Sequence, residues 1–175
     1  MGVLAFYDDQ YKQAQQDLSF ALSLFPPELP RPDSESQSRR LLDTVAFKNK
    51  LLLLSYLVPV NILAGQCPSL TLLAQYPFLD RLFGQLVDAI GKGQLGRFDL
   101  VLDSQRKLFI QRDIYLAVER CRIICFRNLV RRVFLIREKK TRLELHDVLT
   151  AVVVAGCTTV DMDEIECMVA NLIDK

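Results

Sequence analysis

The sequence contains no tryptophan and one histidine, His146, and none of its five cysteines forms a CxxC pair. A catalytic Cys–His pair or a histidine-based metal site would have to use His146. Its neighbours Leu145 and Asp147 complete no motif of either kind, so we expect His146 on the surface or at a helix start. The sequence therefore predicts a protein that is not an enzyme, with no catalytic residue, no cofactor and no metal site.

The cysteines are odd in number, and no secretory signal precedes them. Both features favour a reducing compartment with unpaired thiols. Cys121 and Cys125 are four residues apart and would share one helix face among apolar neighbours. We expect them to be buried thiols rather than metal ligands.

Long hydrophobic runs are also missing. The most apolar stretch, Leu51 to Gly65, has about 15 residues where a membrane span needs roughly 20, and it contains Pro59. We predict a buried core helix here and no membrane partner.

Two short patterns resemble ligand sites without the context that such sites need. Gly91 to Gly96 spells GxGxxG, but no strand precedes it as a dinucleotide site requires, which favours a turn between helices. Asp161 and Asp163 begin like a calcium loop, but Ile165 and Glu166 stand where that loop needs an oxygen ligand and a glycine. We expect these acids at a helix start instead.

What the sequence does contain is helical periodicity, with no convincing alternation of the strand type. An irregular helical stack of tetratricopeptide-like helix pairs is predicted, since no repeat recurs at a fixed period. The proline- and serine-rich residues 26–40 interrupt it as a flexible loop. The helical segments that we expect are 11–25, 41–64, 69–75, 79–90, 96–108, 114–136, 143–154 and 161–173.

Charge is distributed unevenly although the net charge is only +1. Residues 106–142 hold twelve Lys or Arg and three acids, whereas residues 143–175 hold seven acids and one Lys. On one long helix, Arg120, Arg127 and Arg131 would fall within about 40° of one another. Such a stripe, followed by the basic residues 137–142, could hold phosphates, or it could be a solvated face that pairs with acidic protein. Both interpretations remain open at this point.

Three stretches carry a resemblance to a known family. Residues 11–21 read YKQAQQDLSFA, residues 48–60 contain KNK followed by YLVPV, and residues 161–173 contain DEIEC and NLI. These stretches resemble the PCI-domain subunit of the messenger-RNA export complex TREX-two and its signalosome-subunit-twelve-like paralogue. The last 60 residues are similar to the winged-helix end of a PCI domain.

The resemblance implies a helical-repeat part over residues 1–112 and a winged-helix part over residues 113–175, with the β wing truncated because the chain stops at Lys175. It implies a non-catalytic scaffold or adaptor of nuclear messenger-RNA export, located in the nucleus and associated with the nuclear pore. The implied partners are a large helical scaffold subunit, a small acidic disordered subunit, and RNA or DNA bound without sequence preference. The nucleic-acid-binding residues that we carry over are Arg120, Arg127, Arg131, Arg132, Lys139 and Lys140.

Two further expectations follow from the same segment. The third helix of the winged-helix part begins with acids, which would repel phosphates, so we expect it to stay out of a nucleic-acid groove and to pack on the long helix. The alternative function is that of a purely structural PCI subunit in a signalosome-like or proteasome-lid-like assembly, with no nucleic-acid contact.

Overall fold

The structure is a computed structural model, which describes residues 1–25, 37–138 and 142–173. All regular elements in these ranges are helices, and no strand occurs among them, so the predicted all-α fold is confirmed. The chain divides into two compact units, Met1–Leu79 and Asp80–Lys175. Residues 26–36 of the predicted flexible loop lie outside the described residues, and the prediction is wrong for residues 37–40, which are helical.

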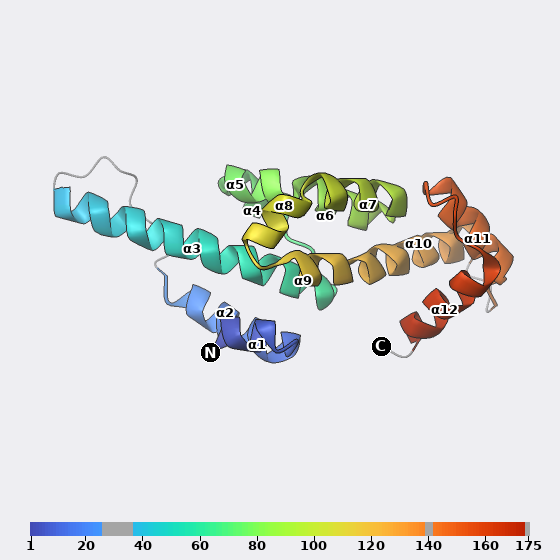
Figure 1. Cartoon of the computed structure of the whole chain (residues 1–175), viewed down its shortest axis with the longest axis horizontal. Coiled ribbons are helices and arrows are strands. Elements are labelled where there is room, and N and C mark those ends of the chain that lie inside the picture. Colours follow the sequence, from blue (N-terminus) through green and yellow to red (C-terminus); the bar gives the residue numbers. More distant parts are fainter. Residues whose placement is uncertain (26–36, 139–141, 174–175) are drawn as a thin grey trace. The chain divides into compact units, whose positions relative to one another are not determined.

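The first unit is built on one long helix with two shorter helices against it. Figure 1 shows α1 and α2, in blue, lying along the later part of α3. Two short helices follow α3. The bounds are α1 (Gly2–Tyr7), α2 (Tyr11–Ser23), α3 (Gln37–Leu63), α4 (Leu70–Gln75) and α5 (Pro77–Leu79).

Helix α2 buries one stripe of small and branched side chains toward its neighbours. Ala14 and Leu18, four residues apart, are almost completely buried, as the helical period requires. Phe6 of α1 meets Tyr56 of α3 edge to face, with ring centroids 5.2 Å apart. A hydrogen bond from the Gln15 side-chain amide to Asn61, 2.9 Å long, ties α2 to α3 as well.

Helix α3 continues through Pro59 to Leu63, although a proline lacks the N–H group that an internal helical position needs. Its segment Val45–Leu63 is long and apolar enough to cross a membrane by length and composition, and 39% of it is buried within the structure. Leu54, Leu57 and Val60 are almost fully buried. The burial of these residues agrees with the predicted core helix.

In the second unit, helices α6, α7, α9 and α11 contact the helix α10. Figure 1 shows α6 and α7, in green, along one side of α10, which is orange, and the contacts between these elements agree. A π-helical turn, η1, begins the unit. The bounds are η1 (Asp80–Gly84), α6 (Gln85–Lys92), α7 (Leu95–Ser104), α8 (Arg106–Gln111), α9 (Tyr115–Arg120), α10 (Arg122–Ile136), α11 (Leu145–Val154) and α12 (Met162–Ile173).

The core of this unit contains four phenylalanine rings with almost no exposed surface: Phe83, Phe98, Phe109 and Phe126. Phe83 and Phe109 stack with their centroids 6.3 Å apart. Because α6 and α7 pack on α10, residues on both sides of the predicted 112/113 division share this core. That division therefore falls inside the second unit.

The three helices expected at the C-terminal end are present as α10, α11 and α12. Helix α11 packs on α10, and α12 turns back from α11 and packs on it, with Val148, Val152 and Ile165 buried. Asp161 accepts a 2.9 Å hydrogen bond from the Glu164 backbone, so the predicted helix start is confirmed. The described residues include no strand that could form a wing, and the winged-helix assignment stays a prediction.

Glycine allows two backbones in this unit to approach closely. Gly93 ends α6 in the left-handed region, with φ 64°, and a Cβ there would lie 2.7 Å from the Leu129 backbone nitrogen. Gly96 donates a 2.9 Å hydrogen bond from its N–H to the Ala155 carbonyl, and a Cβ there would lie 2.9 Å from Gly156. The GxGxxG pattern is thus a turn between helices, as predicted, with close contacts at two of its glycines.

Replacing Gly96 with alanine should destabilise the chain by about 1–3 kcal/mol, because the new methyl group meets backbone atoms that cannot rotate away. Urea unfolding followed by circular dichroism measures this change. Gly91→Ala is the matched control, since nothing lies within 4 Å of a Cβ at that helical position. The control should be neutral or stabilising by up to about 1 kcal/mol. Equal stability of the two variants would contradict the close approach.

Candidate nucleic-acid interface

Helix α10 has a buried side and a basic side. Its buried residues recur at helical spacing, as expected for a helix with one face in a core. Ile136, the last residue of α10, is 79% exposed and lies outside this buried face. The buried set is Ile124, Cys125, Phe126, Leu129 and Val133.

The structure describes four of the six predicted nucleic-acid-binding residues. Arg120 is the last residue of α9, and Arg127, Arg131 and Arg132 lie on α10; all four are exposed. Lys139 and Lys140 lie outside the described residues. Among the four, only exposure is established, and their contact with nucleic acid stays a prediction.

The four arginines do not form one stripe. Arg127 and Arg131 are one helical turn apart, about 40° around the axis, and therefore share a face. Arg132 lies about 140° from Arg127 and points to another side. The helix expected over 114–136 is divided at Cys121 into α9 and α10, so Arg120 belongs to a different helix. The structure brings together Arg127 and Arg131, which we call the basic face.

Other arginines of the same basic segment are already paired inside the unit. Arg122 donates to both carboxylate oxygens of Asp99 on α7, at 2.9 and 3.1 Å. This hydrogen bond raises the pKa of Arg122, against the opposing effect of burial. Arg137 at the end of α10 forms an ion pair with Asp147 of α11. Neither partner could be inferred from sequence spacing, which is 23 residues in one case and 10 in the other.

Arg127 and Arg131 differ from these two. No hydrogen bond or ion pair joins either side chain to another residue in the ranges that the structure describes. The two residues are separated by a rise of about 6 Å along the helix, and an unpaired guanidinium group at each position can hold a phosphate oxygen. The geometry is therefore suitable for a polyanion, with salt-dependent binding.

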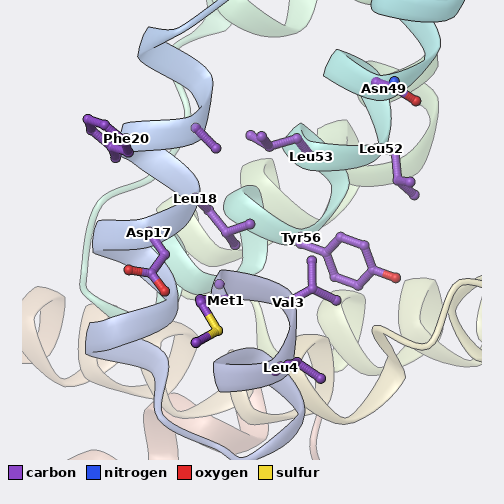
Figure 2. A pocket seen from close by; sticks show the side chains of 12 residues that line it. Met1, Val3, Leu4, Asp17, Leu18, Phe20, Asn49, Leu52, Leu53 and Tyr56 are labelled. Atoms are coloured by element: carbon purple, nitrogen blue, oxygen red, sulfur yellow. The ribbon is translucent and has the colours of Figure 1, made fainter.

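A second surface feature lies in the first unit. An apolar groove of about 490 Å³ opens between α1, α2 and α3, and Figure 2 shows its walls. Leu4 and Phe20 at its edge are 64% and 67% exposed, and Asp17 is its one acidic residue. Exposed apolar surfaces of this kind are typical of contacts with other macromolecules. The full lining is Met1, Gly2, Val3, Leu4, Asp17, Leu18, Phe20, Ala21, Asn49, Leu52, Leu53 and Tyr56.

The other candidate groups have structural positions. His146 is exposed at the start of α11, as predicted. Cys121 and Cys125 are buried, also as predicted. In the described ranges, no group of three His, Cys, Asp or Glu side chains is arranged to hold a metal ion.

Comparison with known proteins gives the relationship of the chain. A PCI domain-containing protein 2 homologue of Drosophila melanogaster is 39% identical over 173 residues, which cover 99% of this chain and 39% of that protein. A CSN12 homologue of Neurospora crassa is 36% identical over 187 residues, covering 99% and 38%. PCI domain-containing protein 2 of Xenopus laevis is 32% identical over 173 residues, covering 99% and 38%. No family model matches the chain.

These similarities confirm the resemblance to PCI-domain proteins, since the chain is homologous to them over nearly its whole length. Within that class, its relatives carry two names, PCI domain-containing protein 2 and CSN12 homologue. The chain spans about two fifths of the length of the curated relatives it matches.

The reactivity of the cysteine thiols tests whether Cys121, Cys125 and Cys157 are buried in the second unit. Burial raises the pKa of Cys125 to about 12, so at about pH 8 its thiol stays protonated and unreactive. Burial and the Asp99 carboxylate also raise the pKa of Cys157. An aromatic disulfide reagent should modify the exposed Cys67 and Cys167 rapidly and the three buried cysteines slowly.

Mass mapping of the modified peptides distinguishes the five positions, and the chain unfolded in urea is the control in which all five react. Rapid modification of Cys125 in the folded chain would contradict its position beside the Ala89 carbonyl, to which its sulfur lies at 3.5 Å.

Proposed function

We propose that the chain is part of a non-catalytic scaffold or adaptor subunit of a nuclear messenger-RNA export complex, located in the nucleus and associated with the nuclear pore. In this proposal the basic face of α10 binds nucleic acid, and the helical-repeat part, residues 1–112, binds partner subunits. The supporting observation is the pair Arg127 and Arg131, exposed on one face and unpaired within the described residues. The relationship to PCI-domain proteins supports the scaffold role.

Binding in this proposal is tolerant of sequence and extends to RNA or DNA. The first turn of α12 carries Asp163 and Glu164, both exposed, and their charges oppose entry of this helix into a groove. We therefore do not expect α12 to act as a recognition helix in the groove of a duplex. Affinity comes from phosphates that displace counterions, and it should decline steeply with salt.

Arg127→Glu/Arg131→Glu should weaken binding of single-stranded RNA about tenfold or more at physiological salt, because two phosphate contacts become repulsions. The measurement is fluorescence anisotropy on the chain co-expressed with its scaffold partner. Removing two phosphate contacts should also lower the slope of log affinity against log salt by about 1.4.

The control Lys12→Glu/Lys48→Glu makes the same change in net charge at two exposed positions of the first unit. It should leave RNA affinity within about twofold, because neither lysine belongs to the basic face of α10. Equal losses in the two double variants would mean that net charge, and not the basic face, governs binding. An unchanged affinity of the α10 variant would refute that face as the RNA surface.

The apolar groove is our candidate for the contact with the large helical scaffold subunit. Leu4→Ser/Phe20→Ser should reduce recovery of the co-expressed complex, because two exposed apolar side chains at the groove edge are removed. Leu108→Ser/Leu116→Ser removes comparable exposed side chains from the second unit and serves as the control. Equal recovery of both complexes, measured by size-exclusion chromatography, would exclude the groove.

A second function rests on a specific observation, the CSN12 homologues among the relatives. In this alternative the chain is a structural subunit of a signalosome-like or proteasome-lid-like assembly, and the basic face holds a small acidic disordered subunit. The pairing of Arg122 with Asp99 and of Arg137 with Asp147 illustrates how arginines of this segment bind carboxylates. Competition between RNA and the acidic subunit for α10 separates the two functions.

A further inference from the structure

A small hollow lies between α10 and α12, next to the basic face. Its volume is about 130 Å³. The two helices belong to the same compact unit, and α12 turns back from α11 in Figure 1. The lining residues are Arg122, Ile123, Phe126, Met168 and Asn171.

The walls of this hollow are apolar, and its edge is polar. Ile123 and Met168 are half-buried, and Phe126 has almost no exposed surface. These three side chains form the apolar part of the lining. Asn171 is exposed and brings an amide with both donors and an acceptor. Arg122 is held by Asp99 and therefore contributes little free charge. The hollow is chemically suited to a flat ring that has hydrogen-bonding groups on its edge.

The size of the hollow limits its occupant. A cavity of about 150 Å³ holds one benzene molecule, whereas sites for complete small ligands measure about 300 Å³ or more. The 130 Å³ of the hollow is therefore comparable in size to one six-membered ring, and a fused two-ring system would extend beyond it. Among nucleobases this favours a pyrimidine.

The hollow and the basic face adjoin along α10. Ile123 lies one helical turn before Arg127, and Arg131 lies one turn after Arg127. The three residues therefore lie in a row on the same side of α10. A nucleotide whose base enters the hollow would have its phosphates beside Arg127 and Arg131. Only an unpaired, splayed base can do this, because a duplex keeps its bases stacked inside.

We infer that the hollow between α10 and α12 binds one pyrimidine base of a single-stranded nucleic acid, and that Asn171 hydrogen-bonds to the edge of that base. The inference rests on the proposed function, since the phosphates of the same strand occupy the basic face. The inferred site would make the surface prefer single strands and pyrimidine bases. Phosphate contacts alone give no preference for a base.

The charge on α12 determines which side of the hollow the strand follows. Glu164 is exposed and lies one turn before Met168, on the side of α12 that lines the hollow. Its carboxylate repels phosphates, so the strand runs along α10. Glu166 lies about 160° away around α12 and faces elsewhere.

The test compares three single-stranded probes of equal length, oligouridine, oligoadenosine and an abasic strand, on the complete chain by fluorescence anisotropy. Oligouridine should bind about fivefold more tightly than oligoadenosine or the abasic strand, as expected for one favourable base site. Asn171→Ala should abolish this preference without changing affinity for the abasic strand. Because Asn171 is exposed, we expect Asn171→Ala to fold normally. Circular dichroism of the variant checks that its fold is unchanged.

A charge-matched pair of variants tests the direction of the strand. Glu164→Gln should tighten binding of oligouridine about two- to threefold, and Glu166→Gln, with the same change of charge, should have a smaller effect. Equal effects of the two variants would overturn the placement of the strand beside Glu164.

The outcomes separate the inference from the function on which it rests. If all three probes bind equally and Asn171→Ala changes nothing, the base site is refuted while the phosphate-binding function stands, and the hollow is left to an apolar side chain of a protein partner. If none of the probes binds at low salt, the proposed function and the inference both fail. A purine preference that survives Asn171→Ala would also overturn the inference.

Discussion

The close backbone approach at Gly93 and Gly96 constrains how the helices of the second unit pack. At these two positions α10 and the end of α11 lie where a Cβ atom cannot fit. The absence of a side chain at Gly93 allows the backbone of α10 to approach the end of α6 closely, and Leu129 is buried there. Because a helix buried on one side exposes the opposite side, the same contact points Arg127 and Arg131 to solvent.

Local sequence signals predicted much of this fold. Helical periods and terminators located most elements to within a few residues, because caps and turns depend on neighbouring residues. Asp161 is an example, since its hydrogen bond spans only three residues. The division of the expected helix 114–136 at Cys121 was missed, because Cys121 keeps right-handed dihedral angles, φ −63° and ψ −13°, and no proline or glycine marks it.

The candidate site was harder to predict, because its composition depends on contacts between distant segments. Sequence analysis counted twelve basic residues between 106 and 142 as one pool. The fold removes Arg122 from this pool through Asp99 and Arg137 through Asp147. Which arginines stay available is therefore a property of packing, and only Arg127 and Arg131 share a face on α10.

The side chain of Asn128 has a consequence for how the second unit moves. Its amide nitrogen donates a 2.8 Å hydrogen bond to the carbonyl of Ile90 in the last turn of α6, and this carbonyl also accepts a hydrogen bond from the Gly93 N–H. The end of α6 is thus capped from α10. Separation of the two helices would leave the Asn128 amide without this partner, so the hydrogen bond favours opening of α6 and α10 together. The helix that carries the basic face is therefore tied to α6 by a polar contact as well as by its buried side chains.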